Sequence, residues 1–214
     1  MLLLALPKLS FAQDPPAWGN CLVSDFWVAA DYSGSIKGFE SYIHDSVKVI
    51  ADGVLKENQS LRLGYVTFNL TQKLVQRPTS DSQKILSAIE DHRGSQATGG
   101  TNIERALSYI SEEQHKIPKI QDTEDLEFKK ILVLISDGQD SKGSKAINKA
   151  KEMKDDGWWI IPIFLDSYKN SQARQESFNF MQELSGSNYT TEKLIDSVAL
   201  NELPEYFAKK FSCM

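Results

Sequence analysis

Five oxygen-bearing side chains in this sequence have the types and the spacing that could bind a hard divalent cation. Asp31, Ser33 and Ser35 alternate within one segment. Thr101 follows two glycines in a second segment, and Asp137 lies between a serine and a glycine in a third. Mg²⁺ prefers oxygen ligands and is commonly bound through one or two carboxylates, with part of its water retained. Each segment alone has the composition of an ordinary turn. The three together predict a metal site.

The elements expected around these segments would bring them together. An apolar run at 26–30 leads into Asp31, and a helical pattern follows. A near-continuous aliphatic run at 131–135 leads into Asp137, as expected of a strand buried on both faces. Thr101 lies just before another helical pattern. Ligands of open α/β sheets bind beyond the carboxyl ends of the strands, so we expect the three segments to meet along one rim.

Strands and helices alternate along the chain. The hydrophobic pattern predicts strands at 25–30, 61–68, 131–135 and 158–165, and a short strand at 70–75 that ends at Pro78 and forms an antiparallel edge hairpin. It predicts helices at 39–56, 81–91, 144–156, 172–184 and 202–212, and one that starts near 103. This alternation favours an α/β fold with one doubly wound, mostly parallel central sheet, one antiparallel edge strand and helices on both faces.

Length and composition fit a globular protein of one large domain or two small ones. The 214 residues include 24 Lys and Arg and 29 Asp and Glu, which gives a net charge of −5. The sequence has no dense basic stripe and no aromatic run between basic residues, so we expect no nucleic acid partner. No apolar run approaches the roughly 20 residues of a transmembrane helix. We see no linker that would divide the segment 21–213.

The two ends of the chain indicate export. Residues 1–12 are apolar and end in a small-x-Ala pattern, which predicts a signal peptide, although its basic start is missing; 13–20 form a linker. Cys21 and Cys213 bracket the predicted domain. In a secreted chain such a pair predicts a disulfide between the two ends of the fold, with two free thiols as the alternative. We therefore expect a secreted, periplasmic or extracellular protein.

The order of the three motifs resembles that of a known family. The motifs are Asp31-x-Ser33-x-Ser35, Thr98-Gly99-Gly100-Thr101 and Ser136-Asp137-Gly138. Their order on the predicted strand–helix alternation is similar to that of the von Willebrand factor type A (VWA) domain and of the integrin inserted domain, over about residues 22–213. This resemblance implies a Rossmann-like VWA fold and a metal-ion-dependent adhesion site (MIDAS).

The resemblance also implies a role for each residue of the site. Ser33 and Ser35 would bind the metal directly through their hydroxyls, and Thr101 would bind it directly or through water. Asp31 and Asp137 would often act through water molecules that they orient. The expected cofactor is Mg²⁺, with Mn²⁺ or Ca²⁺ as alternatives.

The function that the resemblance implies is binding and not catalysis. The metal would lack one strong ligand, and an Asp or Glu side chain of a protein partner would complete its shell. Polar residues that flank the strand-end loops are candidates for a partner-binding rim around the metal: Tyr32, Asn69, Gln96, Asn102, Gln139, Asp140 and Tyr168. Each of them has the alternative of being only a solvated loop residue.

Two other functions stay open on the sequence. An assembly or scaffold subunit could hold a structural metal or use a metal-independent interaction surface. A metal-dependent hydrolase is a more distant alternative. Against an enzyme, His44, His92 and His115 fall on or beside predicted helices, away from the three loops, and no Ser-His-Asp or Cys-His arrangement converges.

Overall fold

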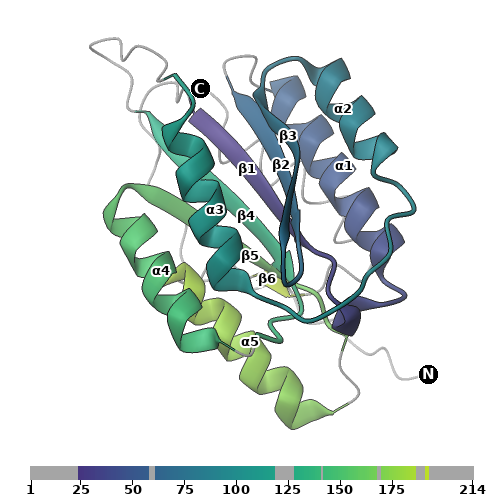
Figure 1. Cartoon of the computed structure of the whole chain (residues 1–214), viewed down its shortest axis with the longest axis vertical. Helices are drawn as coiled ribbons and strands as arrows, with labels where there is room; N and C mark the ends of the chain where they lie inside the picture. The colour runs from purple at the N-terminus through teal and green to yellow at the C-terminus, as the bar shows by residue number, and fades with distance from the viewer. Residues whose placement is uncertain are drawn as a thin grey trace, which may run out of the picture.

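A single mixed sheet forms the centre of the protein. The computed structural model describes residues 24–57, 61–118, 128–140, 142–167, 170–186 and 191–192. Over these residues the strand order is β3-β2-β1-β4-β5-β6 (Figure 1). The strands are β1 (Ser24–Asp31), β2 (Arg62–Phe68), β3 (Gln72–Thr79), β4 (Lys129–Ser136), β5 (Trp158–Phe164) and β6 (Thr191–Glu192). Every strand pair is parallel except β2 with β3. The predicted fold class is thereby confirmed.

Helices cover both faces of this sheet. They are α1 (Glu40–Glu57), α2 (Ser82–Asp91), α3 (Ile103–His115), α4 (Gly143–Asp155) and α5 (Ser171–Ser185), with a short 3-10 turn η1 (Gly34–Ile36) after β1. In Figure 1, α1 and α2 lie on one side of the sheet, and α3, α4 and α5 lie on the other. These helices confirm those predicted within the described residues.

Successive side chains of β1 point into two different hydrophobic cores. Phe26 and Val28 pack in the core that contains Ile43 of α1. Trp27 packs in the core that contains Leu107 of α3. Because helices cover both faces, the central strands are apolar at consecutive positions, as the aliphatic runs predict. Polar side chains therefore concentrate at the ends of these strands.

The edge strand β3 differs from the prediction. It spans Gln72–Thr79 and includes Pro78. The sequence instead predicts a strand over 70–75, followed by Pro78 as the residue that stops it. Pro78 is tolerated there because β3 lies at the edge of the sheet, where a missing N–H breaks no pairing with a further strand. A Cβ atom on Gly64 of β2 would lie 2.8 Å from the Pro78 ring, and the register of the two strands is irregular at this point. The absence of a side chain at Gly64 thus makes room for the proline.

Several predicted features lie outside the described residues. These are the signal peptide and linker, Cys21, Cys213, Tyr168 and the helix at 202–212. The two-residue strand β6 was not predicted, because so short a segment carries no periodic pattern. Among the described helices, none combines the length and the apolar character that a membrane span requires.

A buried polar network joins β1, β2 and α3 at the end of β1 opposite to the Asp31 loop. Asp25 is fully buried and accepts hydrogen bonds from Arg62 Nε at 2.5 Å and Arg62 Nη2 at 2.7 Å. Gln114 Nε2 donates to Asp25 Oδ2 at 2.6 Å, and Trp27 Nε1 donates to Gln114 Oε1 at 2.7 Å. Each of these buried polar groups therefore has a partner, as buried polar groups require.

Candidate functional site

The first loop of the site is built on the carboxylate of Asp31, the last residue of β1. Asp31 is fully buried, and its Oδ1 accepts a hydrogen bond from the Ser33 backbone N–H at 2.8 Å. Its Oδ2 accepts the Ser136 hydroxyl at 2.6 Å. The hydroxyl oxygens of Ser33 and Ser35 are 3.0 Å apart. The loop therefore holds one oriented carboxylate beside two adjacent hydroxyls.

The third loop reaches the same place because β4 pairs in parallel with β1. Ala30 pairs with Ile135, so Asp31 and Ser136 end their strands side by side. The next residue, Asp137, is also fully buried. Its Oδ1 accepts the Gln139 N–H at 3.1 Å, and its Oδ2 accepts the Ser167 hydroxyl at 2.9 Å. Two buried carboxylates thus lie at adjacent strand ends.

Backbone hydrogen bonds join the second loop, which contains Thr98 to Thr101, to the loop that follows Asp31. Gly34 N–H donates to the Gly99 carbonyl at 2.7 Å, and Thr98 N–H donates to the Tyr32 carbonyl at 2.9 Å. A Cβ on Gly34 would lie 3.0 Å from the Gly99 oxygen, so this close approach depends on a glycine. The two loops therefore form one connected surface, which carries Thr101.

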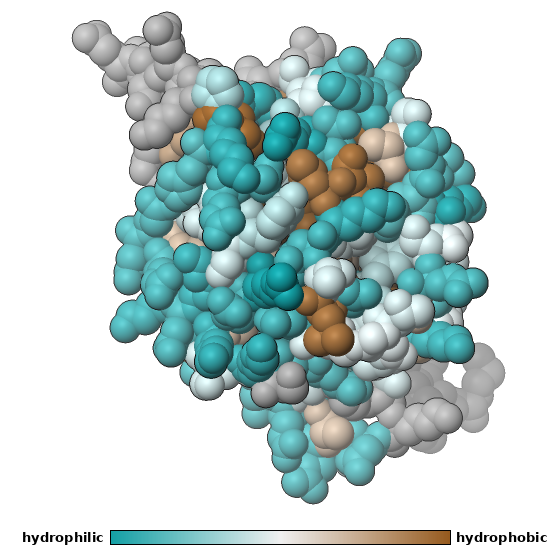
Figure 2. Space-filling model, viewed as in Figure 1, coloured by the Kyte–Doolittle hydropathy of each residue, from teal (hydrophilic) through white to brown (hydrophobic). Residues whose placement is uncertain are grey.

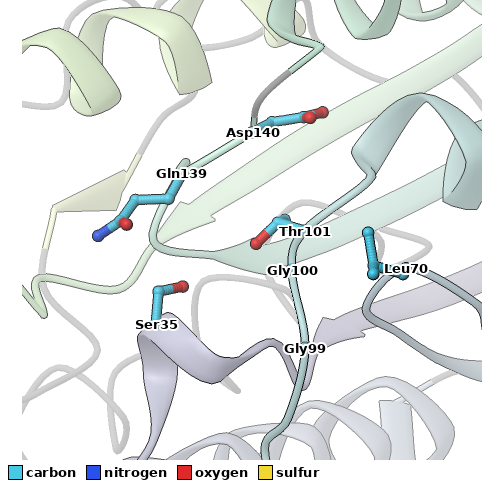
Figure 3. Close-up of a pocket in the computed structure, with 7 residues that line it drawn as sticks. All are labelled: Ser35, Leu70, Gly99, Gly100, Thr101, Gln139 and Asp140. Atoms are coloured by element: carbon cyan, nitrogen blue, oxygen red, sulfur yellow. The ribbon is translucent and has the colours of Figure 1, made fainter.

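A pocket of about 600 Å³ opens where the three loops meet. Its lining residues are Ser35, Leu70, Gly99, Gly100, Thr101, Gln139 and Asp140. In Figure 3 the hydroxyls of Ser35 and Thr101 point toward each other across this pocket. Hydroxyls from two different loops are thereby available to one ligand.

Burial sets the electrostatics of the two carboxylates. It raises the pKa of Asp31 to about 7, with a smaller contribution from the negative charge of Asp137, while hydrogen bonds from Ser136 and Ser33 oppose the rise. Burial also raises the pKa of Asp137, against hydrogen bonds from Gln139, Ser167 and Ser35. A nearby cation would favour the ionised form of both groups.

The chemistry of the donor set fits a hard divalent cation. Within the described residues no group of three or more His, Cys, Asp or Glu side chains gathers, so the softer sites typical of zinc have no counterpart there. The loops instead bring two carboxylates together with neutral hydroxyls. Few anionic ligands and several neutral oxygens suit Mg²⁺ or Mn²⁺.

Gly138 lets the Asp137 loop pack directly on α5. Its φ is +74°, and a Cβ there would lie 2.8 Å from the Ser177 carbonyl oxygen and 3.0 Å from Met181 Cγ. We expect Gly138→Ala to lower the free energy of unfolding by about 3 kcal/mol, because backbone strain adds to overpacking. Gly157→Ala is the matched control, since φ there is +79° and a Cβ meets nothing within 4 Å. Urea unfolding of both variants checks this; equal losses would show that the contact with α5 contributes nothing.

The structure divides the residues predicted to form a rim. Gln139 and Asp140 line the pocket, and Gln96 is exposed on the second loop. The Asp140 carboxylate accepts the Ile103 N–H at 3.0 Å and the Lys142 N–H at 2.8 Å, so it also joins the third loop to the start of α3. These residues are placed where a bound partner could reach them.

Three other rim candidates have structural roles. Tyr32 is only 6% exposed and packs edge-on against His92, with ring centroids 5.3 Å apart. Asn102 is also 6% exposed, and its side chain caps α3 by accepting the Arg105 N–H at 3.1 Å. Asn69 is half-buried and donates to the Thr98 carbonyl at 3.1 Å. In this fold Tyr32 thus packs in the core and Asn102 caps α3, so little of either side chain is accessible.

The histidines lie away from the pocket in this fold. His92 is buried against Tyr32 and Tyr65, with the Tyr65 ring centroid at 5.9 Å. His44 is buried on α1, and His115 ends α3. None of the three lines the pocket where the loops meet.

Solved structures share this fold at low sequence identity. Proximal thread matrix protein 1 from the mussel byssus is 19% identical, with a TM-score of 0.66; the match covers 90% of this chain and 48% of that one. Manganese-loaded TRAP protein of Plasmodium vivax is 15% identical, with a TM-score of 0.67 and coverage of 89% and 74%. The vWF domain of the type V pilus tip protein Mfa5 from Porphyromonas gingivalis is 11% identical, with a TM-score of 0.70 and coverage of 91% and 98%. This chain thus spans about half of the mussel protein.

The sequence itself identifies the family. No curated protein matches it. The family model of the von Willebrand factor type A domain matches residues 25–200, which is most of the chain and contains all three loops of the site. The chain therefore belongs to the von Willebrand factor type A domain family.

Proposed function

We propose that this domain is a binding module that holds a divalent metal ion at Asp31, Ser33, Ser35, Thr101 and Asp137 and recognises an acidic side chain of a protein partner there. VWA domains are typically interaction modules without enzymatic activity, and they commonly bind a divalent metal. The observation that carries the proposal is the pair of buried carboxylates beside hydroxyls that face an accessible pocket.

The protein's own residues are suited to distinct parts of this function. The Asp31 carboxylate is fixed by the Ser33 N–H and the Ser136 hydroxyl, so its orientation does not depend on a ligand. The hydroxyls of Ser33, Ser35 and Thr101 offer neutral oxygens that would not cancel the charge of a cation. When bound, the cation would supply an open coordination position for a carboxylate oxygen. Neutral ligands therefore favour capture of an anionic side chain.

The comparisons support a location outside the cytoplasm as part of the proposal. One solved relative is named as a pilus tip protein, and another as a protein of the mussel byssus. A further relative is named as the pilus adhesin SpaC of Lactobacillus rhamnosus GG. We propose that this domain likewise acts in adhesion, secreted or associated with a cell envelope. The signal peptide at 1–12 and the Cys21–Cys213 disulfide are part of the same proposal.

Metal titration of the full chain tests the site. We expect wild type to bind Mg²⁺ and Mn²⁺ in calorimetry, and Asp31→Ala and Ser33→Ala each to weaken binding by about 10–100-fold. Ser108→Ala is the matched control, because the Ser108 hydroxyl bonds to Glu104 within α3 at 3.2 Å and does not line the pocket. Circular dichroism checks that each variant is folded.

The outcome also separates the alternatives. Failure of the folded wild type to bind either metal at millimolar concentration would contradict the proposal and favour a metal-independent surface. Metal binding whose removal by chelator unfolds the domain would indicate a structural metal. The proposal instead expects a protein that stays folded in chelator and loses only its affinity for carboxylate-bearing partners.

A further inference from the structure

Leu70 is exposed at the edge of the same pocket. It is 52% exposed and lines the pocket with Ser35 and Thr101. Among the described residues the other exposed large hydrophobic side chain is Tyr42, on α1. The face shown in Figure 2 is mainly hydrophilic, with hydrophobic side chains in small separate areas. A single exposed leucine is ordinary on a protein surface. The significance of Leu70 comes from its place beside the predicted metal ligands.

Hydrogen bonds hold the turn that presents Leu70. Asn69 Oδ1 accepts the Thr71 N–H at 2.8 Å and the Thr71 hydroxyl at 3.0 Å. Asn69 Nδ2 donates to the Thr98 carbonyl at 3.1 Å, which ties the turn to the second loop. Arg105 Nη1 of α3 donates to the Leu70 carbonyl at 3.3 Å. The turn is thus fixed on both sides, so a ligand that contacts Leu70 would order little additional backbone.

The backbone of Gly99 and Gly100 lies between Leu70 and the Ser35 hydroxyl (Figure 3). Figure 3 shows Leu70 and Ser35 on opposite sides of the segment that carries Gly99 and Gly100. A Cβ on Gly100 would lie 3.3 Å from Leu70 Cδ2, so any larger residue would crowd this surface. A chain that places a carboxylate near Ser35 and Thr101 can therefore cross the two glycines and reach Leu70.

We infer that the pocket recognises two neighbouring side chains of a partner, an Asp or Glu and an aliphatic residue next to it or one position further. This inference rests on the proposed function and names the partner's chemistry more closely. The aliphatic side chain would cross Gly99 and Gly100 and pack on Leu70, while the carboxylate enters the hydroxyl-lined side. The exposed Arg105 donates a hydrogen bond to the Leu70 carbonyl and so places a positive charge beside this surface. This positive charge would also favour a partner segment that is acidic.

Selection from a random peptide library tests the inference. The full chain is used to select displayed linear peptides in Mg²⁺, and a parallel selection is made in EDTA. We expect peptides recovered only in Mg²⁺ to carry an acidic residue with Leu, Ile, Val or Met within two positions. Replacing that aliphatic residue by alanine in a synthetic peptide should weaken binding by about tenfold, as burial of one aliphatic side chain implies.

Two variants assign the effect to Leu70. Leu70→Ser should bind the parent peptide about tenfold more weakly and lose the discrimination against its alanine analogue, with Mg²⁺ affinity unchanged. Tyr42→Ser removes the other large hydrophobic side chain that is exposed among the described residues. This variant should retain the affinity for the parent peptide and the discrimination against its alanine analogue. Circular dichroism and Mg²⁺ calorimetry show that each variant is folded and loaded.

The possible results are distinguishable. Mg²⁺-dependent peptides with acidic residues but no aliphatic neighbour, or a Leu70→Ser variant that still discriminates, would overturn the inference and leave the proposed function standing. Absence of any Mg²⁺-dependent peptide, with metal bound to the protein, would overturn both the inference and the proposed function. Aliphatic enrichment that Leu70→Ser abolishes would support both.

Discussion

Arg62→Met is expected to lower the free energy of unfolding by about 3–5 kcal/mol, because it leaves the Asp25 carboxylate buried without its ion pair. The two side chains are 19% and 0% exposed, and the guanidinium bonds to both carboxylate oxygens. Methionine keeps much of the apolar stem of the arginine, so the loss reports mainly on charge and not on a cavity. Urea unfolding gives the difference in free energy.

A second variant and a control make this prediction specific. The double change Asp25→Asn with Arg62→Met removes the stranded charge and should recover a large part of the loss. Lys149→Met is the matched control on α4, since Lys149 pairs with Glu152 at 3.1 Å and the glutamate is 67% exposed. Exposed pairs contribute about 0–1 kcal/mol. A loss for Arg62→Met no larger than that of Lys149→Met would show that the network is not a major source of stability.

Asp31→Asn is expected to stabilise the metal-free protein at pH 7.5 by about 2–3 kcal/mol. The carboxyl has a pKa of about 7 in the fold, against its ordinary value of 3.8. Well below pH 3.8 it is protonated in both the folded and the unfolded state and contributes no difference. As pH rises toward 7, the carboxyl of the unfolded chain releases its proton first. The free energy of unfolding therefore falls by up to about 4 kcal/mol. The neutral amide avoids this loss, although its nitrogen cannot accept one of the two hydrogen bonds, which costs about 1 kcal/mol.

Unfolding in EDTA between pH 5 and pH 8 measures this effect. Wild type should lose stability relative to Asp31→Asn as pH rises through this range. Adding Mg²⁺ at pH 7.5 should narrow this difference, because the carboxylate gains more from a cation than the neutral amide does. Asp156→Asn is the control, and its effect on stability should have the opposite sign. The hydrogen bond with Lys130 lowers the pKa of Asp156, so loss of this carboxylate should destabilise the fold. An Asp31→Asn variant that is less stable than wild type at every pH in EDTA would contradict the electrostatic account of the site.

The sequence predicted the sheet and the carboxylates of the site because both depend on short-range patterns. The aliphatic runs before Asp31 and Asp137 specify strands buried on two faces, and parallel pairing then brings their ends together. The burial of Tyr32 and Asn102 could not be predicted in this way. Both lie in loops, and their orientation depends on how one loop packs against another. Leu70 was missed because one apolar residue between polar ones resembles the start of a strand.

The edge strand β3 has a consequence for how the molecule behaves in concentrated solution. An unpaired edge can add a strand from another molecule and so begin aggregation. Here Pro78 has no N–H to donate, and the register of β3 with β2 is irregular, which disturbs the regular spacing of the edge. Lys73 and Arg77 are exposed along the same strand; Lys73 adds positive charge, whereas Arg77 pairs with Glu113 at 3.0 Å. The proline, the irregular register and the exposed lysine all disfavour a continuous ladder between two copies of this edge, so β3 resists the edge-to-edge association that an open parallel sheet otherwise invites.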